Sequence, residues 1–246
     1  MTHIRADNLA LTYRPPKRAL FRAPRALRPA GANVAVPNPL GDVQALRGIS
    51  FELTDGARLG LVGHNGAGKT TLLKLLFGIF EPSAGTIEVD GRRDALFNIN
   101  LGFRRNATGR RNIYLRGLIN GRTKQEIAAL ETQIIEFSEL GDFIDAPMKT
   151  YSAGMAARLA FSIATALEPD ILLMDEWIGA GDPEFQEKAR ARMRELADRA
   201  SIMVLASHNH ALLRRVCTHI LELENGTMRQ LSDADTFFRE YARRKA

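Results

Sequence analysis

Gly63-His64-Asn65-Gly66-Ala67-Gly68-Lys69-Thr70 is the segment that decides the fold. It matches the phosphate-loop pattern, in which a glycine and any four residues precede Gly-Lys-Ser/Thr. An apolar run at 59–62 precedes the segment, and the apolar side of a predicted helix follows it through Leu72, Leu73, Leu75, Leu76 and Ile79. The glycines let backbone N–H groups turn onto phosphate oxygens, and the helix adds its positive N-terminal end. The sequence therefore predicts a strand, a phosphate-binding loop and a helix at the entry to a parallel sheet.

Two side chains in this segment have defined chemistry. Lys69 would reach the β and γ phosphates of a nucleotide, and the Thr70 hydroxyl would bind Mg²⁺. We expect the whole loop and Thr71 to contact ATP. The alternative is a glycine-rich turn that binds nothing, and the flanking strand and helix argue against it.

A second segment, Ile171-Leu172-Leu173-Met174-Asp175-Glu176, reads as a buried strand that ends in two carboxylates. A buried parallel strand delivers Asp175 to the edge of the sheet where the phosphate loop also lies, so Asp175 can hold Mg²⁺ through water. Glu176 then faces the γ-phosphate and would position or deprotonate the attacking water. Acidic residues after a strand are also common as turn or cap residues. The phosphate loop upstream favours the catalytic interpretation.

The rest of the chain predicts one α/β domain. Its 246 residues are 45% hydrophobic and 25% charged, as in an ordinary globular protein. We expect further strands at 3–13, 46–53, 86–89 and 202–206, and helices at 124–140, 151–167, 184–199 and near 232–244. No apolar stretch approaches the roughly 20 residues of a membrane helix, so any membrane role requires a partner. Cys217 is the single cysteine, which excludes an internal disulfide and suits a reducing compartment.

The net charge of +6 is concentrated in a proline-rich insert after Tyr13. Residues 14–28 hold six basic residues and no acidic one, and residues 95–122 form a second acid-free run. A solvated basic face is one interpretation. Contact with anionic lipid, an acidic partner or an acidic polymer is the other, and we expect 14–28 on the membrane side.

A third motif, Tyr151-Ser152-Ala153-Gly154-Met155, opens a predicted helix upstream of the second segment. These residues alone favour a simple helix N-cap at Ser152. By its position, however, the sequence resembles the ATP-binding cassette (ABC) family, whose signature here is usually Leu-Ser-Gly-Gly-Gln. The chain keeps the Ser152 and Gly154 pattern. Asp182 stands where the family has a short acidic loop, and His208 where it has a switch histidine.

This resemblance implies roles for several residues. Ser152 and Gly154 would contact the γ-phosphate bound to a second copy of the chain, and His208 the γ-phosphate in its own subunit. One chain has one such set, so two copies would face each other head to tail. Tyr13 is either the aromatic residue that stacks on adenine in this family or an ordinary tyrosine of an edge strand.

The chain departs from the family on the loop after the third strand. Most members carry a glutamine there that contacts Mg²⁺ and couples to the permease, but no glutamine occurs between Gln44 and Gln125. Asn98 is the nearest positional substitute. We therefore expect Asn98 to take part in the metal site.

Three further stretches, at 108–115, 149–155 and 158–161, look like the ATPase subunits of bacterial polysaccharide exporters. Those exporters serve O-antigen, capsule or teichoic acid. Nothing in nucleotide chemistry requires Thr-Gly-Arg-Arg-Asn-Ile-Tyr at 108–114, which makes this stretch more diagnostic than the phosphate loop.

The resemblance implies a single P-loop NTPase domain over 1–246, with a mostly parallel core sheet, an antiparallel β edge subdomain and a helical signature subdomain at about 95–165. The insert would occupy 14–45, and 231–246 would form one terminal helix with no carbohydrate-binding domain after it. The expected protein is an ATP- and Mg²⁺-dependent homodimer at the cytoplasmic face of the bacterial inner membrane. It would drive a permease dimer that exports a lipid-linked polysaccharide, without a nucleic-acid partner.

Two alternatives belong to other classes. The pI of 9.8 suits a soluble ABC ATPase that acts on nucleic acid or ribosomes, but such proteins usually carry two cassettes or long coiled-coil arms. A metabolic P-loop kinase would leave Ser152, Gly154 and His208 unexplained together. An ABC ATPase for another transported substrate also remains open.

Overall fold

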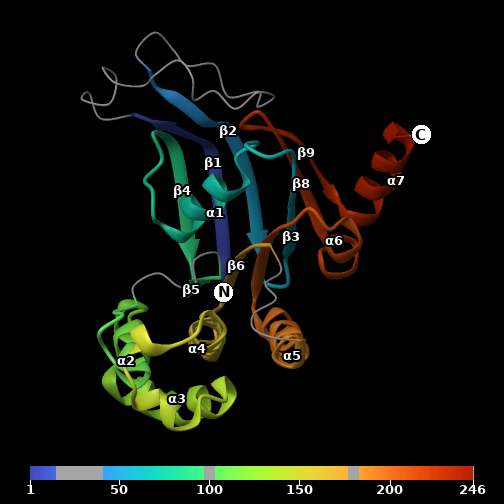
Figure 1. Ribbon diagram of the computed structural model, residues 1–246. Coiled ribbons are helices and arrows are strands. Elements are labelled where there is room, and N and C mark those ends of the chain that lie inside the picture. Colours follow the sequence, from blue (N-terminus) through green and yellow to red (C-terminus); the bar gives the residue numbers. More distant parts are fainter. Residues whose placement is uncertain (15–40, 97–102, 177–182, 246) are drawn as a thin grey trace, which may run out of the picture. The chain divides into compact units, whose positions relative to one another are not determined.

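The computed structural model describes residues 1–14, 41–96, 103–176 and 183–245, drawn in colour in Figure 1. They fall into two compact units. The first comprises the described residues of 1–91, 173–176 and 201–246, and the second those of 92–172 and 177–200. Residues 15–40 of the insert, Asn98 and Asp182 lie outside the described residues.

An antiparallel sheet in the first unit contains β1 (His3–Tyr13), β2 (Val43–Thr54) and β4 (Ala84–Asp90), in the order β2-β1-β4. Buried and open positions alternate along much of β1 and β2, because one face of the sheet packs on the core. The buried side chains include Ile4, Leu9, Leu46 and Ile49. The two expected edge strands are thus confirmed, and β2 begins three residues earlier than expected.

The larger sheet of the first unit follows the order β6-β7-β3-β8-β9. Its strands are β3 (Arg58–Val62), β7 (Ile202–Ala206), β8 (His219–Glu224) and β9 (Thr227–Asp233). The last part of β6 (Ile171–Asp175), from residue 173 onward, also belongs to this unit. β3 pairs in parallel with β7 and β8, and β9 runs antiparallel to β8. Since parallel strands are covered on both faces, they appear in sequence as unbroken apolar runs, which made β3, β6 and β7 predictable.

Helix α1 (Lys69–Phe77) starts directly after the phosphate loop and buries Leu72, Leu73, Leu75 and Leu76. The prediction that Ile79 continues this apolar side is wrong. Gly78 ends the helix in the left-handed conformation, at φ 91°, and Ile79 beyond it is 45% exposed.

The C-terminal part of the first unit contains α6 (His210–Val216), the β8–β9 hairpin and α7 (Ala234–Lys245), which stands beside β8 and β9 in Figure 1. Residues 231–233 belong to β9, so the prediction that the terminal helix starts at 231 is wrong. Asp233 accepts a hydrogen bond from the N–H of Thr236 at 2.9 Å, which fixes the start of α7. Phe237 of α7 is fully buried.

The second unit is mainly helical. It contains β5 (Arg93–Ala95), α2 (Gly109–Ile119), α3 (Lys124–Ser138), the 3₁₀ turns η1 (Gly141–Asp145) and η2 (Met148–Thr150), α4 (Ala153–Ala166) and α5 (Pro183–Arg199). Thr108, Thr123 and Ser152 cap α2, α3 and α4 through their side-chain oxygens. Three of the expected helices are confirmed as α3, α4 and α5. No helix within the described ranges has the length and apolar character needed to cross a bilayer.

Candidate functional site

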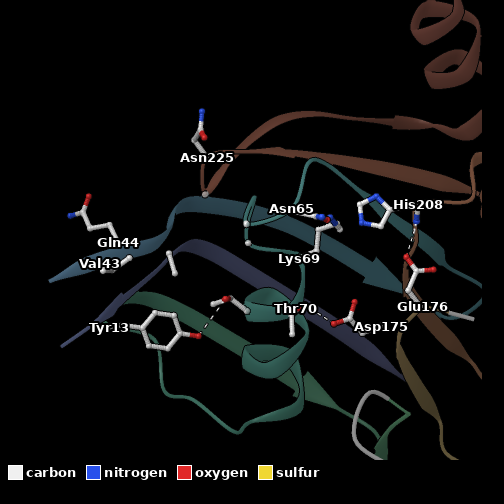
Figure 2. A pocket seen from close by; sticks show the side chains of 15 residues that line it. Tyr13, Val43, Gln44, Asn65, Lys69, Thr70, Asp175, Glu176, His208 and Asn225 are labelled. Carbon is white, nitrogen blue, oxygen red and sulfur yellow. Dashed lines mark hydrogen bonds between the residues drawn. The ribbon is translucent and has the colours of Figure 1, made fainter. Parts of the chain in front are cut away.

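A cavity of about 450 Å³ opens beside the phosphate loop, entirely within the first unit (Figure 2). Loop, strand-end and turn residues line it: Tyr13, Val43, Gln44, Ala45, Asn65, Gly66, Gly68, Lys69, Thr70, Thr71, Asp175, Glu176, His208, Asn225 and Gly226. The structure therefore brings together the two segments that the sequence assigns to nucleotide chemistry. Gly63, His64 and Ala67 belong to the same loop but lie outside this lining.

The loop is shaped for an anion. Gly68 stands at the N-cap of α1 with φ 110°, and no side chain of the described residues caps that helix end. Orphan N–H groups in the first turn of a helix attract phosphate oxygens. The Lys69 ammonium donates to the carbonyl oxygens of Gly63 at 2.7 Å and His64 at 3.2 Å, so it lies folded over the loop.

Lys69 is buried, and burial lowers the pKa of its ammonium, while the carboxylates of Asp175 and Glu176 act in the opposite direction. A cation held in a poorly hydrated place gains from an incoming polyphosphate. The electrostatics of the loop therefore favour an anionic ligand.

The first glycine of the loop has no space for a side chain. A Cβ on Gly63 would lie 2.3 Å from the carbonyl oxygen of Leu223, and its φ is 149°. The backbone of the loop thus runs directly against β8. This close approach explains the glycine that opens the motif.

Thr70 and Asp175 meet at the edge of the cavity, where the threonine hydroxyl donates to the Asp175 carboxylate at 2.5 Å (Figure 2). Hydroxyl and carboxylate oxygens are the ligands that Mg²⁺ prefers, and it usually keeps several waters and substrate phosphates in its shell. In the described part of the chain, no three His, Cys, Asp or Glu side chains gather as a metal cage. The residues thus fit an ion shared between the protein and a nucleotide.

Glu176 follows Asp175 in an unusual backbone conformation. Its φ is 72°, a region that costs energy for a residue with a side chain. Its N–H donates to the carbonyl of Ala206 at 2.8 Å. The carboxylate accepts from the Ser207 hydroxyl at 2.8 Å and from the His208 N–H at 2.9 Å. The turn after β7 thus holds the carboxylate at the cavity.

Tyr13 lines the cavity on the side away from Glu176 and His208 (Figure 2). Its ring packs edge-on against Phe80, with centroids 5.4 Å apart, and its hydroxyl lies 3.3 Å from the Thr71 hydroxyl. An aromatic ring at this place can stack on a base, so both interpretations of Tyr13 stay open.

Sequence reasoning missed part of the lining, namely Val43, Gln44, Ala45, Asn225 and Gly226. The last two form the turn of the β8–β9 hairpin, with φ of 50° and 80°. Asn-Gly between two strands is a strong hairpin signal, so the turn could have been found in the sequence. Its place at the cavity depends on tertiary pairing, so the sequence alone could not show it.

Ser152 and Gly154 lie in the second unit, at the exposed N-terminus of α4. The Ser152 hydroxyl oxygen accepts from the N–H of Met155 at 3.1 Å, which is the ordinary capping interaction. Neither residue lines the cavity of its own chain. Their contact with a second copy stays a prediction, as do the roles of Asn98 and Asp182.

Comparisons with known proteins identify relatives of this chain. The family model for "ABC transporter" matches residues 46–179. The O-antigen export system ATP-binding protein RfbE of Yersinia enterocolitica is 44% identical over 184 residues, covering 75% of this chain and 77% of the relative. RfbB of Myxococcus xanthus, with the same description, is 40% identical over 199 residues, covering 81% of this chain.

The teichoic acids export ATP-binding protein TagH of Lactococcus lactis is 39% identical over 200 residues. This chain spans 46% of the Myxococcus relative and 43% of TagH, which are therefore longer proteins. A solved ATP-binding subunit of an ABC transporter superposes with a TM-score of 0.69 at 21% identity, covering 99% of this chain and 95% of that one. This likeness supports the fold.

Proposed function

This chain belongs to the ABC transporter family, and on that basis we propose that it binds and hydrolyses ATP to drive a separate membrane permease. The observation that carries the proposal is the convergence of Lys69, Thr70, Asp175 and Glu176 on one cavity. Phosphoryl transfer to water requires a cation, metal ligands and a carboxylate near the reacting phosphate. Lys69 supplies the cation, Thr70 and Asp175 the metal ligands, and Glu176 the carboxylate.

The chain's own residues act mainly by positioning. The loop N–H groups and Lys69 bind the phosphates and offset their charge, and Thr70 with Asp175 holds Mg²⁺, which supplies further charge neutralisation when bound. Glu176 orients the attacking water and accepts its proton, and His208 lines the same cavity. Tyr13 stacks on the base in this proposal.

We assign the transported substrate to the class of lipid-linked polysaccharides. Several relatives at 38–44% identity are named as O-antigen or teichoic acid export ATP-binding proteins. A permease dimer provides the path across the inner membrane, and the chain acts from its cytoplasmic face. Two copies of the chain, one against each permease half, would close around two ATP molecules.

The first experiment tests the ATPase assignment. Glu176→Gln keeps the shape of the side chain but cannot accept a proton, so we expect ATP turnover to fall by about 10²-fold or more while ATP affinity stays within about threefold. Lys69→Ala should weaken nucleotide binding itself. Turnover is measured by phosphate release, and affinity by titration with a fluorescent ATP analogue.

Glu52→Gln is the matched control, because Glu52 is an exposed carboxylate on β2, outside the cavity lining. It should match the wild type in both assays. A purified Glu176→Gln variant with wild-type turnover would overturn the role of Glu176. In cells, the same variant should abolish surface display of the polysaccharide when expressed with its permease.

A further inference from the structure

The turn between β7 and α6 makes contacts with Glu176 that the proposed function does not explain. Each oxygen of the carboxylate has its own donor: Oε2 accepts from the Ser207 hydroxyl at 2.8 Å, and Oε1 from the His208 N–H at 2.9 Å. All three residues belong to the first unit. A glutamate side chain at a protein surface is otherwise free to change rotamer, and two donors on two oxygens restrict it to one orientation.

The Ser207 hydroxyl is itself held in place. Ser207 is 2% exposed, so water does not compete for its hydroxyl. The hydroxyl oxygen accepts from the N–H of Asn209 at 3.1 Å, which leaves its single proton for Glu176. Asn209 in turn caps α6 by accepting from the N–H of Leu212 at 3.0 Å. The donor to Glu176 is thus anchored in a helix start.

Ser207 lies outside the lining of the cavity, whereas Glu176 and His208 line it. Its hydroxyl therefore acts on the reaction only through the carboxylate that it contacts. The positive φ of Glu176 adds to this argument, because strained backbone persists where the surroundings fix it, and such places concentrate at functional sites.

We propose that Ser207 is a positioning residue for ATP hydrolysis, and that its hydroxyl fixes the Glu176 carboxylate in the orientation that receives the attacking water. The proposal rests on the ATPase function proposed above. A misplaced general base lowers the rate of the chemical step and leaves nucleotide binding intact, because the binding groups lie on the phosphate loop.

The test compares Ser207→Ala with the wild type in steady-state ATP hydrolysis. We expect kcat to fall about tenfold with KM and ATP affinity within about twofold. Ser207→Thr, which keeps the hydroxyl, should recover most of kcat, whereas Ser207→Val, which has the same shape as threonine without the hydroxyl, should not. The threonine and valine pair decides the question even if Ser207→Ala fails to fold.

A double-mutant cycle separates this role from a structural one. In a Glu176→Gln background, Ser207→Ala should cause little further loss, because the carboxylate that it orients is already gone. An equal tenfold loss in both backgrounds would contradict the proposal. Ser138→Ala is the control, since Ser138 is also a buried serine. Its hydroxyl donates to the carbonyl of Ile135 at 2.8 Å, and it lies on α3 of the second unit. It should leave kcat unchanged.

The two proposals fail in different ways. Absence of ATP hydrolysis by the wild type would overturn the proposed function. Normal hydrolysis by the wild type and by Ser207→Ala or Ser207→Val would overturn only the role of Ser207.

Discussion

Four non-glycine residues in the described part of the chain have a positive φ: Asn8, Glu139, Glu176 and Asn225. Two of them, Glu176 and Asn225, line the cavity. Each such conformation costs on the order of 1 kcal/mol or more and persists only where neighbouring groups hold it. Glu176 is held by the turn after β7. Asn225 is held through its carbonyl, which accepts from the Arg47 guanidinium. Two of these four strained positions thus lie at the candidate site.

A buried carboxyl in the second unit gives a prediction at the residue scale. Asp94 of β5 is 7% exposed, and burial raises its pKa to about 6, against opposing effects of the Ala95 N–H, Arg116 and Arg122. In the unfolded chain, this carboxyl has its ordinary pKa of 3.8. Between these values the folded state binds more protons, so the free energy of unfolding falls as pH rises, by up to about 3 kcal/mol.

Asp94→Asn removes this titration. Urea unfolding of wild type and variant at pH 4, 5.5 and 7 should show the wild type losing about 2 kcal/mol relative to the variant over that range. Asp142→Asn, at an exposed carboxyl of the same unit, serves as the control. If wild type and Asp94→Asn changed in parallel with pH, the buried titration would be disproved.

At the scale of elements, the β8–β9 turn contacts two other segments of the first unit, the phosphate loop and β2. The N–H of Gly226 donates to the carbonyl of Ala67 in the phosphate loop at 3.0 Å, and the N–H of Arg47 on β2 donates to the carbonyl of Gly226 at 2.7 Å. A Cβ on Gly226 would lie 2.5 Å from the carbonyl oxygen of Ala45. The turn therefore supports the phosphate loop from the side of β2.

Gly226→Ala should consequently weaken ATP binding by about tenfold or more, because the clash with Ala45 displaces the turn from the loop. Gly56→Ala is the matched control: Gly56 also has a positive φ, of 88°, but no atom lies within 4 Å of the place where its Cβ would be. The positive φ should lower the stability of both variants by a similar amount. Thermal unfolding measures how much stability each variant loses. Equal ATP affinities in the two variants would show that the turn does not support the loop.

The elements differed in how well the sequence predicted them, for physical reasons. Strands β3, β6 and β7 are continuous apolar runs, and the phosphate loop has a motif of fixed glycine, lysine and threonine positions. The sequence therefore predicts these strands and the loop. Helix α6 has seven residues and follows a hydrogen-bonded turn, and α2 carries little apolar periodicity, so neither was expected. The contacts of Ser207 and Gly226 come from segments far apart in the chain. Such tertiary pairing leaves no local pattern in one sequence.

At the scale of the whole molecule, Lys69 and Glu176 line the cavity of the first unit, and Ser152 and Gly154 lie at an exposed helix start of the second unit. If two copies complete each other's sites, damage to either set of residues abolishes both sites of a homodimer. Two different damaged chains can nevertheless form one intact site.

Mixing a Lys69→Ala chain with a Gly154→Asp chain tests this arrangement. Each variant alone should be nearly inactive. In a heterodimer, one site carries both substitutions and the other carries neither, so heterodimers purified by two different tags should hydrolyse ATP at roughly half the wild-type rate when the sites act independently. A Lys69→Ala chain mixed with a Lys69→Ala, Gly154→Asp chain is the control, since every site then lacks Lys69 and no activity should return. Heterodimers as inactive as either parent would reject shared sites that act independently, because a residue that served only its own chain could not be rescued by a partner.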